Sequence, residues 1–279
     1  MLTSAGFVAG FERELVVAEE AARKAGDVLL RRYRDPAGPS FETKPDGSPV
    51  SQADLEANAV IEATLRHAFP GDAWLSEESA DDLARLGAGR VWIVDPLDGT
   101  RGFLGRTDDF GVHVALAVEG APTVGVVFHP VQAALYRAVA GQGAFRVADD
   151  GVTRIRTSSG ARLADFRIGI SRTNAPPALL QWLEREGLAA RAVRWGASGK
   201  YTSLAQGDLE AVVTVTFGEK EWDSCAPELI VREAGGEVTD GHGGRLTYNQ
   251  RQVDRPRGVV SSNGACHPEL LARLAGLYP

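Results

Sequence analysis

WIVDPLDGT, residues 92–100, is the most informative run of this 279-residue chain. Its apolar start predicts a buried strand that ends at Asp95, because the proline that follows disfavours helical geometry in the preceding residue. Asp98 supplies a second carboxylate three residues later, and the Leu97 carbonyl lies between the two acids. Three oxygen donors at a strand end suit a hard cation such as Mg²⁺. The same run can offer a phosphate two backbone N–H groups, those of Gly99 and Thr100.

A simpler interpretation of this run stays open. A turn closed by an Asx hydrogen bond, with the second acid capping the next helix, uses the same residues and is common. A calcium-binding loop of the EF-hand type is disfavoured, because it needs acids at alternate positions before its glycine. A phosphatase with an aspartyl nucleophile has its acids in a D-x-D pattern, and the two acids here are one residue further apart.

Further acidic residues occur at the ends of other predicted elements. Glu77 and Glu78 come directly after the apolar segment 73–75, where a strand is expected to end. Asp223 opens a predicted helix in the second half of the chain, and Asp54 opens one in the first half. An acid at a helix start is most often a cap. Taken together, these acids nevertheless strengthen the metal-binding interpretation.

The composition is that of an ordinary folded protein. Hydrophobic residues make up 44% and charged residues 24% of the chain, and no apolar run approaches the roughly 20 residues of a membrane span. The net charge of −7 argues against a broad nucleic-acid surface, which needs a basic face. The two cysteines, Cys225 and Cys266, are expected to be buried thiols in a reducing compartment. Because residues 1–10 also lack a secretory pattern, we expect a cytoplasmic protein.

Helices and strands are predicted to interleave along the whole chain, which favours a layered α/β or α+β sandwich. In the first half we expect helices at 12–32 and 54–69, a loop at 41–51, and strands at 90–94, 111–118, 123–128, 135–139 and 144–147. In the second half we expect strands at 166–171, 209–215 and 257–261, and helices at 177–186, 198–206, 225–234 and 268–275. A loop-rich joint at 148–162 separates the halves. The chain is therefore divided into two subdomains of one unit, 1–150 and 151–279.

Other familiar catalytic patterns are absent from the sequence. No P-loop, dinucleotide-binding glycine pattern or nucleophile elbow occurs at the required spacing. The five histidines are scattered, so we find no histidine-based catalytic set and expect surface or core roles for them. No strong protein nucleophile is therefore in view.

Four segments together resemble the signature of the inositol monophosphatase family, a superfamily of Mg²⁺-dependent, lithium-sensitive phosphatases. They are WLSEES at 74–79, the run at 92–100, Trp222-Asp223 with Ala226, and AGG at 234–236. Their order and spacing agree from about residue 12 to about residue 270. The resemblance implies an α+β or α/β fold, namely the layered αβαβα sandwich of the inositol monophosphatase and fructose-1,6-bisphosphatase type. The N-terminal subdomain would carry most of the metal ligands.

The resemblance also assigns roles to the matching residues. Thr100, with Asp46 or Glu77 behind it, would orient the attacking water. Two or three Mg²⁺ ions are expected, with Asp95 shared between two of them. This agrees with simple electrostatics, because clustered carboxylates repel one another unless cations neutralise them. The expected metal ligands are Glu77, Asp95, Asp98, Asp223 and the carbonyl of Leu97.

The segment 44–54, KPDGSPVSQAD, resembles the branch of the family that hydrolyses 3′-phosphoadenosine 5′-phosphate to AMP and phosphate. In that branch the acid matching Asp46 pairs with the catalytic threonine, and the segment matching Asp54 carries a further metal-site acid. A lysine and a serine that match Lys200 and Ser198 contact the nucleotide, although the branch usually has one more serine before the lysine. The residues expected to bind substrate are Gly99, Thr100, Ser198, Lys200 and Asp223.

The sequence therefore predicts a Mg²⁺-dependent phosphomonoesterase for a small phosphorylated substrate, with 3′-phosphoadenosine 5′-phosphate as the expected one. Inositol-1-phosphate and histidinol-phosphate phosphatases share most of these motifs and stay open as alternatives. A non-catalytic regulatory protein that binds metal or nucleotide is a rival of another class, and a Ca²⁺-binding module is a third. No nucleic-acid or membrane partner is expected. A homodimer is an open alternative, because members of the family are often homodimers.

Overall fold

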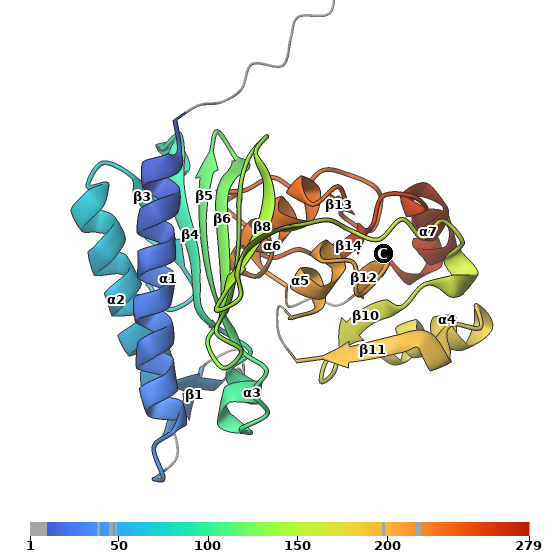
Figure 1. The fold of residues 1–279 in the computed structure, drawn as a ribbon, viewed down its shortest axis with the longest axis horizontal. Coiled ribbons are helices and arrows are strands. Elements are labelled where there is room, and N and C mark those ends of the chain that lie inside the picture. The colour runs from blue at the N-terminus through green and yellow to red at the C-terminus, as the bar shows by residue number, and fades with distance from the viewer. Residues whose placement is uncertain are drawn as a thin grey trace, which may run out of the picture.

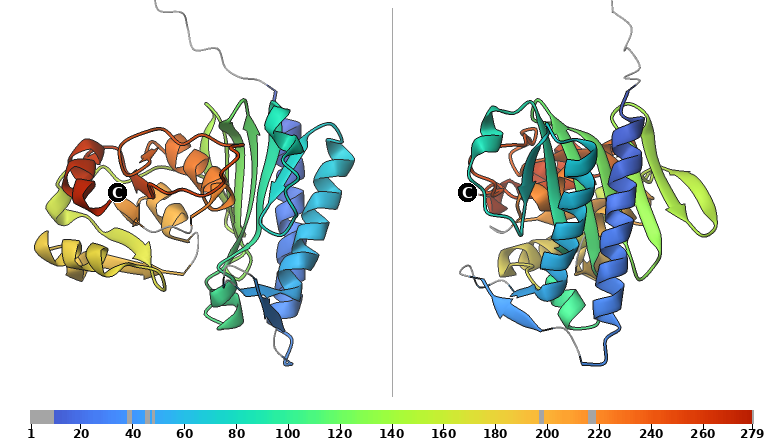
Figure 2. Two further views of the ribbon diagram at one scale, coloured as in Figure 1. Left: turned by 180° about the vertical axis from the view of Figure 1, so that it is seen from behind. Right: turned by 90° about the vertical axis from the view of Figure 1, so that its left-hand side faces the viewer.

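A pair of long helices packed side by side forms the N-terminal layer of the fold (Figure 2, right). The computed structural model describes residues 10–278 except 38, 39, 45, 46, 48, 197, 198 and 216–218. Helix α1 spans Glu12–Tyr33 and α2 spans Gln52–Ala68, which confirms both predicted helices. Ala18, Ala22 and Leu29 are buried at helical spacing, so α1 turns an apolar stripe inward.

A seven-stranded sheet lies against these two helices, in the strand order β3-β4-β5-β6-β7-β8-β9. Strands β3 and β4 are parallel, and every other neighbouring pair is antiparallel. A tight turn at Glu119-Gly120 joins β5 to β6, and φ is positive at both residues, as a type I′ hairpin requires. The strands are β3 (Ala73–Ser76), β4 (Arg90–Asp98), β5 (Gly111–Val118), β6 (Ala121–His129), β7 (Ala134–Val139), β8 (Gly143–Ala148) and β9 (Gly151–Ile155).

A five-stranded sheet forms in the second half, in the order β11-β10-β12-β14-β13. Its strands are β10 (Ile168–Ser171), β11 (Ala192–Trp195), β12 (Ala211–Thr214), β13 (Glu237–Thr239) and β14 (Val259–Ser262). The helices that accompany it are α4 (Pro177–Arg185), α5 (Gly199–Ala205), α6 (Glu221–Glu233) and α7 (His267–Leu274). The remaining short elements are β1 (Phe41–Thr43), β2 (Pro49–Ser51), α3 (Thr100–Leu104) and 3₁₀ turns at Ala84–Gly87, Leu163–Asp165, Ala189–Arg191 and Ala275–Leu277.

Helix and sheet layers alternate to give an αβαβα sandwich (Figure 1). Helices α1 and α2 cover one face of the large sheet, α5 and α6 lie between the two sheets, and α4 and α7 cover the outer face of the small sheet. Each interface has its own apolar core. Side chains of β12 alternate between two of these cores: Val212 packs with α5 and α6, whereas Ala211 and Val213 pack with α4 and α7. The predicted fold class is confirmed.

Two stretches near the 92–100 run differ from the sequence expectation. Segment 41–51, predicted to be a loop, contains the short antiparallel hairpin of β1 and β2. Strand β4 continues to Asp98 instead of ending at Asp95. The register with β5 shifts between these two aspartates, which is where proline is tolerated within a strand.

Other differences lie in the second half and at its border. The predicted joint at 148–162 contains β9, which pairs with β8 and extends the large sheet beyond residue 150. Helix α6 begins at Glu221 rather than at Cys225. Strands β11 and β13 are only four and three residues long, too short to show a hydrophobic period in the sequence. The division of the chain at residue 150 stays a prediction.

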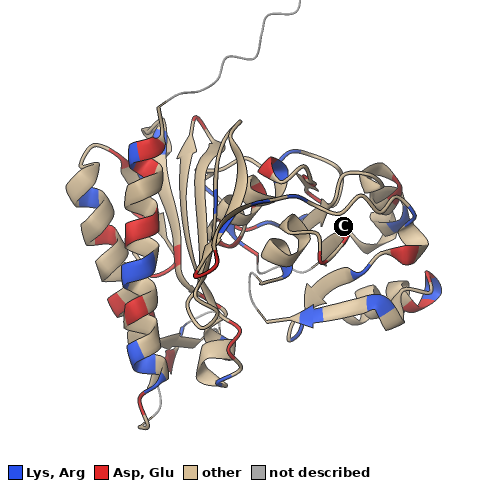
Figure 3. Ribbon diagram, in the orientation of Figure 1, with Lys and Arg blue, Asp and Glu red and all other residues tan. Residues whose placement is uncertain are grey.

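Charged residues of both signs are spread along the visible side of α1 (Figure 3). Glu12 and Glu14 lie in its first turn, and Arg31 and Arg32 in its last, where the helix dipole favours each sign. None of the described helices is both long and apolar enough to span a membrane.

Candidate active site

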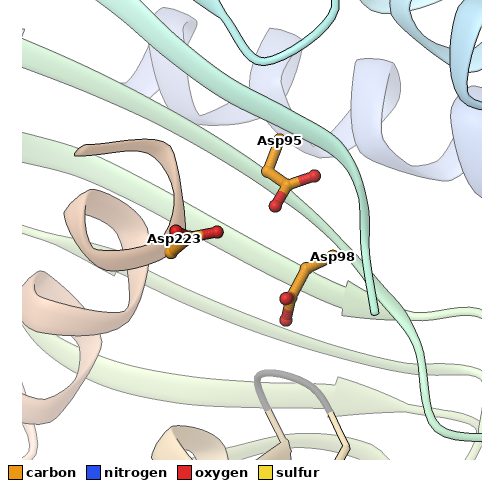
Figure 4. A group of neighbouring side chains, drawn as sticks. All are labelled: Asp95, Asp98 and Asp223. Carbon is orange, nitrogen blue, oxygen red and sulfur yellow. The ribbon is translucent and has the colours of Figure 1, made fainter. Parts of the chain in front are cut away.

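A bulge in β4 brings the two aspartates of the 92–100 run to the same face of the large sheet. Side chains alternate along a regular strand, so residues three apart would face opposite ways. Here Asp95 pairs with His113 and Asp98 with Gly111, so the β4 chain advances by three residues while β5 advances by two. Leu97 accordingly packs into the core beneath α1 and α2, while both acids turn toward the start of α6 (Figure 4).

Local hydrogen bonds hold this bulge. The Leu97 N–H donates to Asp95 Oδ1 at 3.0 Å, and Thr100 Oγ1 lies 3.3 Å from the Leu97 carbonyl oxygen. Gly99 lies between Asp98 and Thr100 and is the N-cap of α3. Its φ is 89°, a value that residues with a Cβ rarely adopt. The Asx hydrogen bond considered from the sequence is therefore present. It coexists with the acidic cluster rather than replacing it.

Asp223 reaches the same point from the other half of the chain. It is the third residue of α6, and its Oδ2 accepts a hydrogen bond from the Lys220 N–H at 2.6 Å, so it also caps the helix. Figure 4 shows the three carboxylates turned toward a common space. One carboxylate oxygen from each of Asp95, Asp98 and Asp223 lies within 4.8 Å of the others. Acids far apart in the sequence thus meet in one hollow.

This cluster is electrostatically unfavourable without a cation. Asp95 is 1% exposed, and burial, followed by repulsion from neighbouring acids with Glu77 first, raises its pKa well above the usual value. The pKa of Asp223 is raised in the same way, by burial and then by repulsion from Asp98. Oxygen donors at this spacing fit Mg²⁺, whose charge removes the repulsion. The residues present therefore suit the expected ion.

Glu77 follows β3, as the sequence predicts, and a lysine holds it. The Lys44 ammonium lies 2.8 Å from Glu77 Oε1 and 2.5 Å from Glu78 Oε1. Burial opposes the charge on Lys44, but attraction to Glu77 and Glu78 outweighs burial, and the pKa of this lysine is raised. Burial raises the pKa of Glu78 to about 7, although Lys44 opposes the shift. Glu77 is not one of the three closely grouped acids, but its charge acts on Asp95.

Asp54 contributes to the site in a way that sequence reasoning missed. It is the third residue of α2, and its Oδ2 accepts hydrogen bonds from Ser51 N at 2.7 Å and Ser51 Oγ at 2.5 Å. Its Oδ1 accepts a hydrogen bond from Thr100 Oγ1 at 3.2 Å. Burial raises the pKa of this carboxyl.

The sequence predicts a different partner for Thr100. Of the two expected acids, Glu77 is held by the lysine of β1–β2, and Asp46 lies outside the described residues. The sequence offered two signals for Asp54: the resemblance of its segment to one that carries a metal-site acid, and the spacing of a capping box, Ser51-x-x-Asp54. The capping-box pattern predicts where a helix starts, but it does not predict which group the second carboxylate oxygen contacts.

A cavity of about 420 Å³ opens beside the acidic cluster. Arg101 and Asn174 both line it, and Arg101 Nη1 donates to Asn174 Oδ1 at 3.1 Å. The lining includes five residues that the sequence predicts for the site: Glu77, Asp98, Gly99, Thr100 and Asp223. It also includes Lys220, whose segment 219–223 resembles the nucleotidase branch, and three residues with no recognisable sequence signal: Arg101, Thr173 and Asn174.

Two predicted substrate residues are not placed in this lining. Lys200 lies in the first turn of α5, with its ammonium 4.7 Å from the centre of the Tyr201 ring, and it is not among the described residues that line the cavity. Ser198 lies outside the described residues. A contact between Lys200 and a substrate therefore requires its side chain to turn away from Tyr201, or a substrate that extends past the cavity.

The model of the inositol monophosphatase family matches residues 12–276 of this chain. The chain belongs to this family. One relative is the 3′-phosphoadenosine 5′-phosphate phosphatase of Mycobacterium leprae. It is 36% identical to this chain over 268 residues, which cover 95% of this chain and 93% of that protein. The 3′(2′),5′-bisphosphate nucleotidase CysQ of Escherichia coli is 34% identical over 235 residues, or 84% of this chain and 93% of that protein.

Solved structures give the same fold. The extragenic suppressor protein suhB from Bartonella henselae superposes with a TM-score of 0.79 at 31% identity, covering 94% of this chain and 98% of that one. The family and its phosphatase members make this chain a phosphoric monoester hydrolase. Inositol monophosphatase family members are generally Mg²⁺-dependent, in agreement with the acidic cluster.

Proposed function

We propose that this chain is a Mg²⁺-dependent 3′(2′),5′-bisphosphate nucleotidase that removes the 3′-phosphate of 3′-phosphoadenosine 5′-phosphate and leaves AMP. The observation that carries the proposal is that Arg101 and Lys220 line the same cavity as the acidic cluster. A substrate with two phosphates needs cationic groups for the phosphate that is not hydrolysed. The names of the relatives in Mycobacterium leprae and Escherichia coli support this choice of substrate.

The proposed metal ligands are the five groups expected from the sequence: Glu77, Asp95, Asp98, Asp223 and the Leu97 carbonyl. Two or three ions are proposed, with Asp95 shared. Bound Mg²⁺ would polarise the scissile phosphate, favour loss of a proton from water and stabilise the leaving 3′-oxygen. The bulge of β4 places the carboxylates of Asp95 and Asp98 on one face of the sheet, because a regular strand would point one of them to the other face.

Thr100 and Asp54 are proposed to take the proton from the attacking water. The Thr100 hydroxyl donates to Asp54 Oδ1, so the lone pairs of its oxygen can accept a hydrogen bond from water. As the water attacks phosphorus, its proton moves to Thr100 and the threonine proton moves to Asp54, which leaves Thr100 neutral. Burial raises the pKa of Asp54, and a higher pKa makes a better proton acceptor. Asp46 and Glu77 stay as alternatives for this role.

The substrate contacts are proposed around the phosphate and the nucleoside. The N–H groups of Gly99 and Thr100 would donate to phosphoryl oxygens as charge develops on them. Gly99 suits this position because it has no Cβ and its φ is positive. Asp223 would lie near the leaving oxygen, and Ser198 and Lys200 would contact the nucleotide.

A substrate panel tests the proposal. Phosphate release would be measured for 3′-phosphoadenosine 5′-phosphate, inositol 1-phosphate, histidinol phosphate and fructose 1,6-bisphosphate, with Mg²⁺ varied. We expect kcat/KM to be highest for the bisphosphate nucleotide, and release to stop when EDTA removes the ions. A higher kcat/KM for inositol 1-phosphate or histidinol phosphate would replace the nucleotidase by that activity. Tight Mg²⁺ or nucleotide binding without release from any ester would instead indicate the regulatory alternative.

A further inference from the structure

His113 lies on β5 beside the acidic cluster and outside the set of residues that the reaction uses. It is 1% exposed and is the cross-strand partner of Asp95. Its Nδ1 lies 3.2 Å from the Trp222 carbonyl oxygen, and its Nε2 lies 3.4 Å from Asp98 Oδ2. One buried ring therefore contacts both the end of β4 and the start of α6. These are the two segments that supply the clustered aspartates.

The contacts of the ring determine where its proton lies. A carbonyl oxygen can only accept a hydrogen bond, so Nδ1 carries a proton and donates to Trp222. Among the described residues the buried Nε2 has no hydrogen-bond partner, although a carboxylate oxygen of Asp98 lies 3.4 Å away. A buried polar atom left without a hydrogen bond costs free energy and calls for an explanation. Filling the core would not require it, because an aliphatic side chain would serve without that cost.

A second buried histidine shows the ordinary structural case. His129 on the neighbouring strand β6 is 8% exposed, and its Nε2 lies 3.1 Å from Thr202 Oγ1. Burial lowers the pKa of His129 to about 4, so this ring is neutral near pH 7. Its hydrogen-bond partner belongs to α5 and not to either segment that supplies the aspartates. His129 is therefore a matched control for the burial of His113 without its contacts.

We propose that His113 is a positioning residue for the metal site. It ties the carbonyl that precedes Asp223 to the sheet and sets the edge of its ring against Asp98, so that the two carboxylates reach one cation from different halves of the chain. The inference rests on the metal-dependent function proposed above, and it concerns affinity for the ion rather than the chemical step. Partners that orient metal ligands typically change metal affinity by about 10- to 100-fold when they are removed.

Four variants separate the two contacts. His113→Leu removes both, whereas His113→Asn places an amide near the position of Nδ1, within reach of the Trp222 carbonyl. His113→Gln places its amide near the position of Nε2, within reach of Asp98. His129→Leu is the control. Affinity for Mg²⁺ would be measured by titration calorimetry on metal-stripped protein, and for Mn²⁺ by electron paramagnetic resonance, with Tm as the check of folding.

We expect His113→Leu to weaken Mg²⁺ binding by at least about tenfold and both amides to recover part of the loss, while His129→Leu keeps wild-type affinity. Wild-type affinity in folded His113→Leu would overturn the inference, and so would an equal loss in His129→Leu. If His113→Leu does not fold, the amides decide: wild-type affinity in both His113→Asn and His113→Gln, each of which lacks one contact, overturns the inference. Absence of Mg²⁺ binding in the wild-type protein would instead remove the proposed function itself.

Discussion

Helices α2 and α6 begin in the same way but contribute differently to the site. In each, the third residue is an aspartate whose Oδ2 accepts the N–H of the residue before the helix, from Ser51 to Asp54 at 2.7 Å and from Lys220 to Asp223 at 2.6 Å. Asp54 directs its other oxygen to Thr100, whereas Asp223 joins the aspartates of β4. The same local capping rule thus fixes both helix starts. What differs is the group that the fold places opposite each one.

The largest effect is expected from Asp223→Asn. An amide can still accept the Lys220 N–H, so the helix start survives, but the cluster loses the charge that holds an ion. We expect kcat/KM to fall about a thousandfold, which corresponds to roughly 4 kcal/mol, and Mg²⁺ affinity to fall with it. Phosphate release and titration calorimetry check both, and Asp95→Asn should behave alike. Activity within tenfold of wild type at ordinary Mg²⁺ would remove Asp223 from the metal site.

Asp54→Asn at the start of α2 is expected to slow the reaction without weakening metal binding, unlike Asp223→Asn at the start of α6. An amide has one acceptor oxygen and cannot take a proton, so it cannot serve both the helix cap and Thr100 as the carboxylate does. We expect kcat to fall about a hundredfold, the usual contribution of a general base, while Mg²⁺ affinity stays within twofold. Steady-state kinetics over a range of Mg²⁺ concentrations measures both. A loss of metal affinity as large as that of Asp223→Asn would show that both helices supply ligands.

Thr100→Ala should reproduce the effect of Asp54→Asn if the two residues act as one unit. We expect unchanged Mg²⁺ affinity and a fall in kcat of similar size, about a hundredfold. The double variant should then be hardly slower than either single variant, because residues that share one proton path are not additive. Single and double variants would be compared in the same phosphate-release assay. Fully additive losses would mean that the 3.2 Å hydrogen bond between the two side chains has no part in the proton transfer.

The sequence was sufficient for the parts of the fold and site that depend on local pattern. The helical period of α1, the apolar start of β4 and the helix starts near Asp54 and Asp223 are visible in single segments, and the structure bears them out. The face of the sheet to which Asp98 points was not predictable in this way. It depends on the register with β5, which shifts by one residue after Asp95.

Contacts between distant segments escaped prediction for the same reason. The hydrogen bond from Thr100 to Asp54 and the contacts of His113 join segments that only the complete fold brings together. A lone histidine in an apolar strand carries no pattern of its own. Nothing in the sequence distinguishes His113 from His129, whose hydrogen-bond partner is the buried Thr202.

Lys200→Ala tests a third helix start, that of α5, which has no acid in its first turn. If the lysine turns from Tyr201 to a substrate phosphate, its loss removes one charge-assisted hydrogen bond. We then expect KM for 3′-phosphoadenosine 5′-phosphate to rise about tenfold and KM for inositol 1-phosphate to change little. Lys24→Ala is the control, because that lysine lies on α1 and pairs with the exposed Glu20. An equal change for both substrates would leave Lys200 without a role in choosing the nucleotide.

The smallest effect is expected from Ser51→Ala, which weakens one helix start and removes a hydrogen bond to Asp54 Oδ2, not to the Oδ1 that accepts from Thr100. Its hydroxyl accepts the Ala53 N–H and donates to Asp54, but it does not contact Thr100. Loss of such a cap costs about 1 kcal/mol of stability, which thermal or urea unfolding would detect. We expect kcat and Mg²⁺ affinity to stay within about twofold of wild type, since the Ser51 N–H still holds Asp54 in place. If kcat of this variant instead fell as far as that of Asp54→Asn, the hydroxyl cap would itself be needed for proton transfer. The difference between Asp54 and Asp223 would then come from how rigidly each aspartate is held, and not from the group that each one faces.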